Sequence, residues 1–163
     1  MARKRDDAKS ASAYDKALAL LARREHSARE LKSKLAQRGL DTDESAKALA
    51  QLKEKDYQSD MRFGEMLVRS RLEGGYGERW IVAELRTHGI AEAQARELVA
   101  GAEPDWPELI RRQLRRRYGG KRPKDTAERN KHATFLIRRG FDAATVQSIT
   151  RAEGLEPSAD EFD

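Results

Sequence analysis

The sequence predicts an all-α protein, an elongated array of three tandem three-helix repeats. Apolar residues recur at the three- and four-residue spacing of helices that bury one face. A helix-ending pattern, apolar-x-x-x-Gly-apolar, occurs three times, with its glycines at Gly39, Gly89 and Gly140. These glycines are about 50 residues apart, a spacing within the size range of helical repeats.

The composition supports an elongated molecule. Charged residues make up 37% of the 163 residues, well above the quarter or so that is usual in globular proteins. A long helical protein has more surface for its volume and so accommodates this charge. The chain has no cysteine, which excludes disulfides, thiolate metal sites and a cysteine nucleophile and fits a reducing compartment.

The N-terminus gives no sign of export. The opening residues, MARKRDDAKSAS, are basic but lack the apolar core of a signal peptide. No apolar run approaches the length needed to span a bilayer. We therefore expect a cytoplasmic protein without a membrane segment.

We expect residues 1–13, which are small and polar, to be disordered, and the first repeat to occupy residues 14–58. Its first helix runs to about Arg24 and buries Tyr14, Ala17, Leu18 and Leu21. Its second helix begins with the capping box Ser27-x-x-Glu30 and ends at Gly39. Its third helix opens at Asp41 and buries Ala46, Leu49 and Leu52.

The second repeat occupies residues 59–104 and begins at Ser59 or Asp60, either of which can cap a helix. Gly64 lies inside this helix, where glycine costs about 1 kcal/mol relative to alanine, so it marks a close contact with another helix. The cluster Gly74–Gly77 breaks the helix, and neither other repeat has a matching cluster. The positions expected to be buried are Phe63, Met66, Leu67, Ile81, Leu85, Ala95, Leu98, Val99 and Ala102.

The third repeat occupies residues 105–154, and an acidic tail follows at 155–163. The repeat opens with Asp105-Trp106-Pro107-Glu108, and proline is tolerated in a first turn. Its second helix begins with the capping box Asp125-x-x-Glu128. His132 takes the place that Leu31 and Ile81 hold in the other repeats, which predicts the weakest of the three cores. The other positions expected to be buried are Trp106, Leu109, Ile110, Leu114, Val146 and Ile149.

The three repeating glycines are expected to end helices in the left-handed conformation. In such a Schellman cap the apolar residues on either side of the turn touch each other. A basic residue (Arg38, His88 or Arg139) precedes each glycine, where the helix dipole favours positive charge.

No group of residues has the spacing of a catalytic or metal site. His26, His88 and His132 fall in different structural settings, and none has a second ligand at metal spacing. The glycines at 74–77 lack the strand and lysine of a phosphate loop and are interpreted as a turn. We therefore expect no enzyme activity and no cofactor.

The functional signal is cationic. The net charge is +5 and the pI about 9.5. Between Arg111 and Lys124 there are eight basic residues and no acidic one, which favours an anionic partner. Arginine is suited to fork-like contacts with phosphate or carboxylate. The candidate partner contacts are Arg111, Arg112, Arg115, Arg116, Arg117, Lys121, Arg122 and Lys124, with Arg62, Arg69, Arg71 and Arg79 in the middle repeat.

Aromatic residues near these charges allow two interpretations. Tyr76 and Tyr118 can stack on a base or on a partner's side chain, or serve as packing and turn residues. Tyr76 is included among the candidate contacts. Trp80 and Trp106 are expected to be core or inter-repeat contacts.

A helix, a glycine turn and a second helix also outline a helix-turn-helix. In that interpretation the helices after Gly39, Gly89 and Gly140 would enter a major groove. These helices are mixed in charge, net acidic or without an early arginine, whereas base readout needs such side chains at the helix start. Sequence-specific DNA binding is therefore disfavoured.

The middle repeat carries a family resemblance. SDMRFGEMLVRSRLEGGYG followed by IVAELRTHGI resembles the core of the RecX family, regulators of the RecA recombinase. ALALLARREHSARELKSKLAQRGL and RNKHATFLIRRGF extend the resemblance over about residues 14–154, more loosely in the third repeat. Glu78 departs from the family pattern, which often has proline there.

The resemblance implies a curved array of three-helix repeats without enzyme activity. It implies a modulator that inhibits RecA by binding in the groove of the RecA–DNA filament and restrains ATP hydrolysis, strand exchange and co-protease activity. The partners would be the RecA filament and, weakly and without sequence preference, single- or double-stranded DNA, and the protein is expected to be a monomer. The alternative is a general non-sequence-specific nucleic-acid-binding helical repeat protein.

Overall fold

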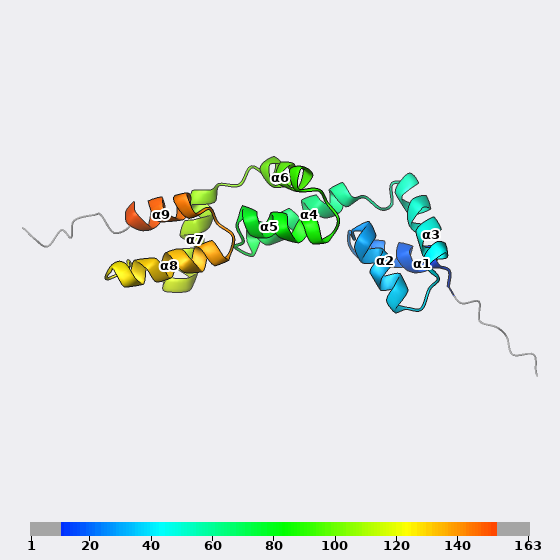
Figure 1. Cartoon of the computed structure of the whole chain (residues 1–163), viewed down its shortest axis with the longest axis horizontal. Helices are drawn as coiled ribbons and strands as arrows, with labels where there is room; N and C mark the ends of the chain where they lie inside the picture. Colours follow the sequence, from blue (N-terminus) through cyan, green and yellow to red (C-terminus); the bar gives the residue numbers. More distant parts are fainter. Residues whose placement is uncertain (1–10, 153–163) are drawn as a thin grey trace, which may run out of the picture. The chain divides into compact units, whose positions relative to one another are not determined.

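The computed structural model describes residues 11–152, and every element of regular structure in that range is a helix (Figure 1). The helices are α1 (Ala13–Leu21), α2 (Ala28–Gln37), α3 (Thr42–Glu54), α4 (Asp60–Glu73), α5 (Glu78–Thr87), α6 (Glu92–Gly101), α7 (Trp106–Tyr118), α8 (Thr126–Arg138) and α9 (Ala143–Ala152). The prediction of an all-α chain of three three-helix repeats is confirmed. Elongation and curvature stay predictions, and the acidic tail at 155–163 lies outside the described residues.

The chain divides into two compact units. The first ends at Phe63 and contains α1 to α3, and the second begins at Gly64 and contains α5 to α9, so the division falls within α4. Of the N-terminal segment expected to be disordered, residues 1–10 lie outside the described range. Ala13, the last residue of that segment, opens α1 and is buried.

The first unit buries a small aliphatic core because α3 packs against both α1 and α2. Ala17, Leu35 and Leu52 are fully buried at its centre. Two expectations were wrong here. The first helix ends at Leu21, with Ala22 as its C-cap, rather than near Arg24. Ala46 is exposed, because the face of α3 turned inward carries Ser45 and Ala48 instead.

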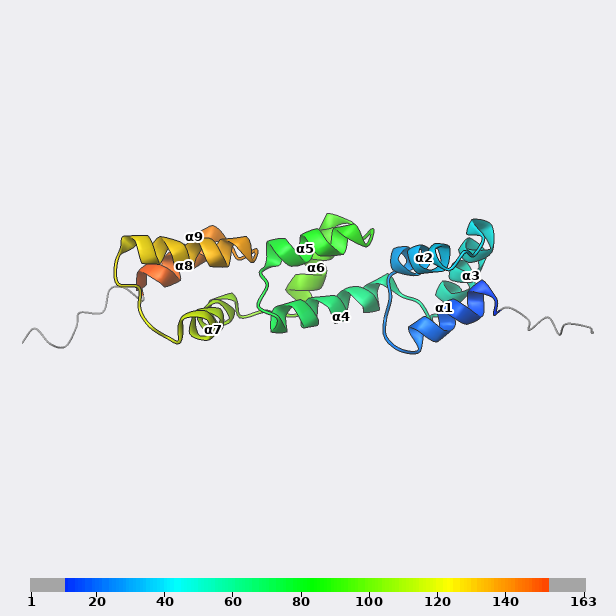
Figure 2. The same cartoon turned by 90° about the horizontal axis from the view of Figure 1, so that it is seen from below.

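In the middle repeat the chain reverses at the turn between α4 and α5 (Figure 2). A Cβ on Gly64 would lie 2.5 Å from Leu98 Cδ1. This glycine therefore allows α6 to pack close to α4, as predicted. Ile81, Leu85 and Val99 are buried, as expected. Ala102 is exposed, contrary to the prediction, because α6 ends at Gly101 and Ala102 is only its C-cap.

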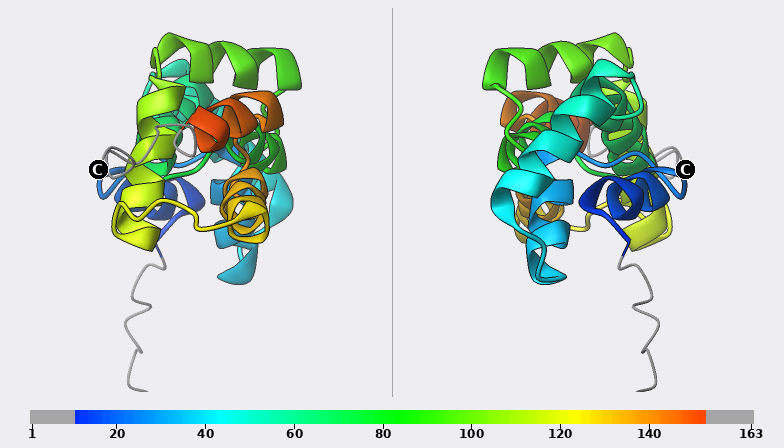
Figure 3. Two further views of the ribbon diagram at one scale, coloured as in Figure 1. Left: turned by 90° about the vertical axis from the view of Figure 1, so that its left-hand side faces the viewer. Right: turned by 90° about the vertical axis from the view of Figure 1, so that its right-hand side faces the viewer.

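In the third repeat α9 packs against both α7 and α8 (Figure 3). Its core is formed by Ile110, Leu114, Leu136, Phe141, Val146 and Ile149. His132 is buried, and its ring stacks on Tyr118 with 3.6 Å between centroids. An aromatic pair therefore fills the place that leucine and isoleucine occupy in the other repeats.

The three glycine caps have Schellman geometry, as predicted. Gly39, Gly89 and Gly140 have φ of 76°, 82° and 93°. The amide after each glycine donates to the carbonyl five residues earlier, over 3.2 Å (Leu40 to Leu35), 3.3 Å (Ile90 to Leu85) and 3.2 Å (Phe141 to Leu136). These bonds satisfy carbonyls that a helix end leaves unpaired.

Among the helices of residues 11–152, none combines the length and the apolar character that crossing a membrane requires.

Candidate partner-binding surface

The cationic run lies on α7 and on the loop that follows it. Asp105 caps α7 by accepting a hydrogen bond from the Glu108 amide over 3.0 Å, and Gly119 ends the helix with φ of 65°. Ile110, Gln113 and Leu114 face the core. The exposed members of the run are Arg111, Arg115, Arg116, Arg117, Lys121, Arg122 and Lys124.

Some of these cations already have partners within the chain. Arg115 forms an ion pair with Glu108 over 2.6 Å, and the Arg117 guanidinium lies 5.3 Å from the centre of the Phe135 ring. Within residues 11–152, Arg111, Arg116 and Lys121 form no ion pair. The side chain of Lys124 forms none either, so these four charges are the ones most available to an anionic partner.

Arg112 has an internal role. It is half-buried, and its guanidinium donates to the Leu72 carbonyl over 3.1 Å. Leu72 belongs to the last turn of α4, so Arg112 links the middle repeat to the third. A substitution of Arg112 would disturb this link as well as the surface charge.

The helix and the loop bring their cations together. Arg111 and Arg115 from α7, with Lys121 and Arg122 from the loop, line one side of a hollow of about 270 Å³. Leu114, Gly120 and His132 form the rest of its lining. Cations that converge on a concave surface raise the local positive potential more than the same charges spread along a helix.

The candidate arginines of the middle repeat differ in whether they form ion pairs within the chain. Arg62 binds Glu25 and Asp56, each over 2.9 Å, and these two hydrogen bonds raise its pKa. Arg71 forms a two-bond pair with Glu84 at 2.7 Å, and this hydrogen bond likewise raises the pKa of Arg71. Arg69 and Arg79 are exposed and form no ion pair within residues 11–152.

The glycine turn at 74–77 is held by Arg139, which the sequence indicated only as the basic residue of a helix cap. Its Nε donates to the Gly75 carbonyl over 2.8 Å and its second guanidinium nitrogen to the Gly74 carbonyl over 2.7 Å. The same guanidinium lies 4.4 Å from the centre of the Tyr76 ring. The candidate contact Tyr76 is thus half-buried beneath a cation of the third repeat.

Two backbone hydrogen bonds complete this joint. The Gly77 amide donates to the Arg139 carbonyl over 2.8 Å, and the Arg79 amide donates to the Gly140 carbonyl over 3.1 Å. A Cβ on Gly77 would lie 2.3 Å from the carbonyl carbon of Gly140. The glycine cluster is therefore the place where the middle repeat meets the backbone of the third.

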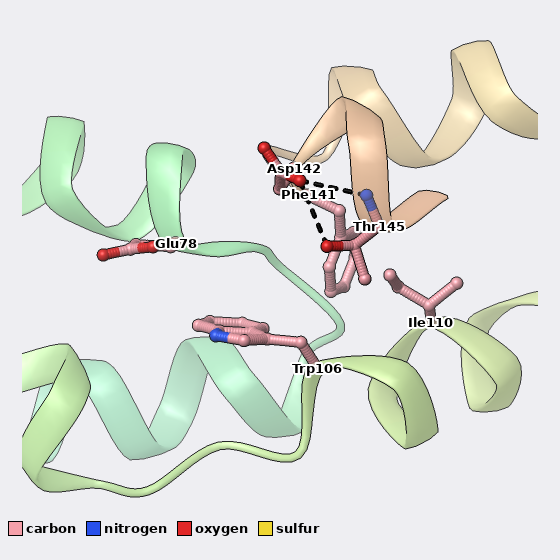
Figure 4. Close-up of a pocket in the computed structure, with 6 residues that line it drawn as sticks. All are labelled: Glu78, Trp106, Ile110, Phe141, Asp142 and Thr145. Atoms are coloured by element: carbon pink, nitrogen blue, oxygen red, sulfur yellow. Dashed lines mark hydrogen bonds between the residues drawn. The ribbon is translucent and has the colours of Figure 1, made fainter. Parts of the chain in front are cut away.

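The two tryptophans have different settings. Trp106 meets the Phe141 ring edge-on, with 6.2 Å between centroids, as expected for a core contact (Figure 4). Trp80 is 45% exposed, so of the two alternatives expected for it, a core residue or an inter-repeat contact, it is the inter-repeat contact. Its backbone packs against Gly140, and its ring stacks on Tyr76 with 4.9 Å between centroids.

The hollow beside Trp106 is small. It holds about 60 Å³ and is lined by residues that include Glu78, Ile110 and Asp142 (Figure 4). Ligand pockets are several times larger, at about 300–1,000 Å³. The pKa of Asp142 is lowered because its carboxylate accepts hydrogen bonds from the backbone and hydroxyl of Thr145, so this group acts as the cap of α9.

A larger groove in the second unit was not predicted from the sequence. It encloses about 530 Å³, and the exposed ring of Trp80 forms part of its wall. The other aromatic side chains along it are Tyr76, Tyr118 and Phe135, and the cations are Arg117, Lys131, Arg138 and Arg139. Lys131, Arg138 and Arg139 lie on or next to α8, whose mixed sequence gave no signal of a shared surface.

No group of three or more His, Asp or Glu side chains is placed to hold a metal ion within residues 11–152. His26 is buried, and burial, the largest effect, lowers its pKa. Its Nδ1 donates to the Arg24 carbonyl over 2.9 Å, which fixes the link between α1 and α2.

These features define a class of all-helical tandem-repeat proteins with a cationic surface on the third repeat. Family models assign the three repeats in order. Residues 13–59 match "RecX, first three-helix domain", residues 59–98 the second, and residues 103–150 the third. The chain belongs to the RecX family.

Curated relatives agree with this assignment, and solved structures agree with the fold. "Regulatory protein RecX" of Stenotrophomonas maltophilia (strain K279a) is 44% identical over 136 residues, 83% of each chain. "Regulatory protein RecX" of Xanthomonas axonopodis pv. citri (strain 306) is 41% identical over 143 residues, 88% of each chain. The crystal structure of RecX from Lactobacillus salivarius has a TM-score of 0.68 at 21% identity and covers 88% of this chain and 96% of its own. Another RecX crystal structure has a TM-score of 0.72 at 21% identity, over 85% of this chain and 70% of its own.

Proposed function

We propose that this protein is a non-enzymatic modulator of the RecA recombinase that binds in the groove of the RecA–DNA filament. Occupying the groove restrains ATP hydrolysis, strand exchange and co-protease activity. The protein acts as a monomer, and its cationic surface contacts the filament. Membership of the RecX family supports the regulatory class, because its curated relatives carry the name of a regulatory protein.

The observation that carries the proposal is the set of unpaired cations on the third repeat. Arg111, Arg116 and Lys121 are exposed on one helix and its following loop, and no carboxylate within residues 11–152 forms an ion pair with them. A filament groove offers both DNA phosphates and acidic protein side chains, which are the partners that arginine forks bind.

The remaining candidate contacts fall into two groups. The first group supplies further positive surface charge for the same partner contact and consists of Arg69, Arg79, Arg115, Arg117, Arg122 and Lys124. Arg62, Arg71 and Arg112 use their guanidinium groups within the chain, so we assign them to holding the repeats in place and only secondarily to partner contact.

The test is the ATPase rate of RecA filaments on single-stranded DNA with the protein added at increasing ratios. We expect the rate to fall as the protein approaches stoichiometric amounts, since groove occupancy acts at each filament site. An ATPase rate that stays unchanged at stoichiometric protein contradicts the proposal.

A second candidate function is general nucleic-acid binding without RecA. The run of eight basic and no acidic residues between Arg111 and Lys124 favours it. This function predicts that the protein binds DNA tightly on its own, with an affinity that falls steeply as salt is raised, and that it leaves the filament ATPase unaffected.

A further inference from the structure

We propose that the groove lined by Trp80, Tyr118 and Phe135 binds single-stranded nucleic acid by stacking a base on Trp80. The groove lies within the second unit and is walled by the start of α5, the end of α7 and one face of α8. The inference deepens the proposed function, on which it rests for a nucleic-acid partner. It adds a binding mode, base stacking, and a ligand class, single-stranded nucleic acid. Neither follows from the cationic run on α7.

The first support is an aromatic face left open to solvent. Trp80 is 45% exposed, although burying an indole contributes more apolar area than most side chains can offer. Its other contacts hold it in place. The ring stacks on Tyr76 with an angle of 23° between the two planes, and the Trp80 backbone packs against Gly140. Because the ring is exposed but already held in one orientation, it loses little conformational entropy when a base stacks on it.

The second support is how the cations are arranged among the rings. Arg139 lies 4.4 Å from the Tyr76 ring centre and 5.6 Å from that of Phe135, and Arg117 lies 5.3 Å from that of Phe135. Lys131 and Arg138 add two exposed positive charges on α8, the helix that carries Phe135. Alternating rings and cations suit a polymer whose bases and phosphates alternate.

The third support is that no carboxylate of residues 11–152 lines the groove. Tyrosine, tryptophan, phenylalanine, arginine, lysine and one threonine form it. Elsewhere in the described chain arginine is often paired with glutamate, as at Arg71 and Glu84. An acid-free lining keeps its positive potential for a ligand. Its volume of about 530 Å³ falls within the range of ligand-binding pockets.

Single-stranded nucleic acid fits these features better than the alternatives. The bases of a duplex are already stacked on each other, so a duplex offers the groove phosphates but few free faces. An acidic peptide satisfies the cations, but its carboxylate side chains have no flat apolar faces to cover the exposed indole. Unpaired bases supply both the faces and the phosphates.

The test is a titration of the full chain against a fluorescently labelled oligothymidylate of about 20 nucleotides, a length that covers more than one expected site. A duplex of equal length and a polyglutamate peptide are titrated under the same salt conditions. The variants are Trp80→Ala, Trp80→Phe and Ile137→Ala. Ile137 is an exposed apolar residue of α8 that does not line the groove, so it controls for loss of apolar surface. Circular dichroism checks that each variant keeps its helix content.

We expect Trp80→Ala to weaken single-strand binding about tenfold, and Trp80→Phe to weaken it less than about threefold because a ring remains. Duplex binding should change by less than about twofold in both, and the Ile137→Ala variant should match the wild type. The salt dependence of single-strand binding should be unchanged by Trp80→Ala, since no charge is removed.

Wild-type single-strand affinity in Trp80→Ala overturns the proposal. So does an equal loss on the single strand and the duplex, because it indicates a general effect on charge or fold. Loss of polyglutamate binding with unchanged oligonucleotide affinity would assign the groove to an acidic protein segment and also overturn it. These outcomes concern DNA alone, so they are distinct from failure of the proposed function, which appears as an unchanged RecA ATPase.

Discussion

At the scale of single residues, Arg139 shows how one side chain joins two repeats. Its guanidinium donates to the carbonyls of Gly74 and Gly75, and its own carbonyl accepts from the Gly77 amide. Lysine cannot replace it, because one ammonium cannot reproduce a planar fork that also lies over the Tyr76 ring. The sequence placed Arg139 at a helix end, where a basic residue is common, and gave no sign of this second role.

His26 is the residue whose protonation should change the stability of the first unit. Burial lowers its pKa from the ordinary value of 6.5, while nearby Arg24 and Lys34 oppose and Glu30 favours its positive charge. The unfolded chain therefore takes up a proton more readily than the folded one. The stability that neutral His26 contributes is fully present above about pH 6.5 and is lost as the pH falls.

We expect the wild type to lose more stability than His26→Gln between about pH 7.5 and about pH 5.5, by at most about 1.4 kcal/mol per pH unit. Urea unfolding followed by circular dichroism at both pH values measures this difference, and carboxylates common to both proteins cancel. Equal pH dependence in the two proteins would show that His26 titrates alike in the folded and unfolded states.

Residue-level burial was only partly predictable from the sequence. Leu31, Leu35 and Leu85 were assigned correctly because each is the single large apolar residue of its turn. Ala46 and Ala102 were assigned wrongly, because alanine fits either face of a helix and spacing alone cannot distinguish them. For Trp80 the sequence left a core residue and an inter-repeat contact open, and it gave no sign of the groove beside the ring.

At the scale of elements, the glycines separate into those that need an unusual backbone and those that need space. Gly39 has a positive φ, and nothing lies within 4 Å of where its Cβ would be. Gly77 has an ordinary φ of −89°, yet a Cβ there would collide with the Gly140 and Phe141 backbone. Backbone cannot move aside as a flexible side chain can. A substitution of Gly77 therefore tests the joint between the middle and third repeats.

We expect Gly77→Ala to destabilise the second unit by about 1–3 kcal/mol, because the added carbon forces the two repeats apart and breaks backbone hydrogen bonds. Gly101→Ala is the matched control. It places the same carbon in the last turn of α6 with nothing within 4 Å, and alanine favours a helix, so stability should rise by a few tenths of a kcal/mol. Thermal unfolding of both variants measures the contrast. Similar melting temperatures in the two would show that the joint tolerates a side chain at Gly77.

Helix caps were the best-predicted elements. Ser27, Asp105 and Asp125 cap their helices as expected, each accepting from the amide three residues later. The three Schellman glycines were also correct, since both kinds of cap depend on a few neighbouring residues. The joint at Gly77 was not predictable, because its partner Gly140 is distant in the sequence and its pairing is set by tertiary packing.

At the scale of the whole molecule, the three repeats share one helical unit but differ in how the charges on their surfaces are paired. Some cations of the first unit are paired, as in Arg24 with Glu30 and Arg62 with Glu25. The third repeat leaves Arg111, Arg116 and Lys121 without an ion pair in the described chain. The sequence run from Arg111 to Lys124 predicted this surface as a whole but not the internal use of Arg112. The proposed division is that buried packing stabilises the repeats and that unpaired charge on one of them contacts the filament.

This division guides the choice of variant. Replacing Arg112 would confuse loss of charge with loss of its bond to the Leu72 carbonyl. The variant Arg111→Glu, Arg116→Glu, Lys121→Glu changes only exposed residues. The variant Arg23→Glu, Lys32→Glu, Lys47→Glu makes the same change in net charge on exposed residues of the first unit.

The most direct test of the account is the concentration at which each variant half-inhibits the ATPase of RecA–DNA filaments. We predict that reversing the three charges of the third repeat raises this concentration at least about tenfold, because lost contacts to phosphate and carboxylate weaken binding. The control variant should stay within about threefold of the wild type, since long-range effects of net charge are screened by salt. Equal inhibition by the third-repeat variant and the wild type would contradict the account.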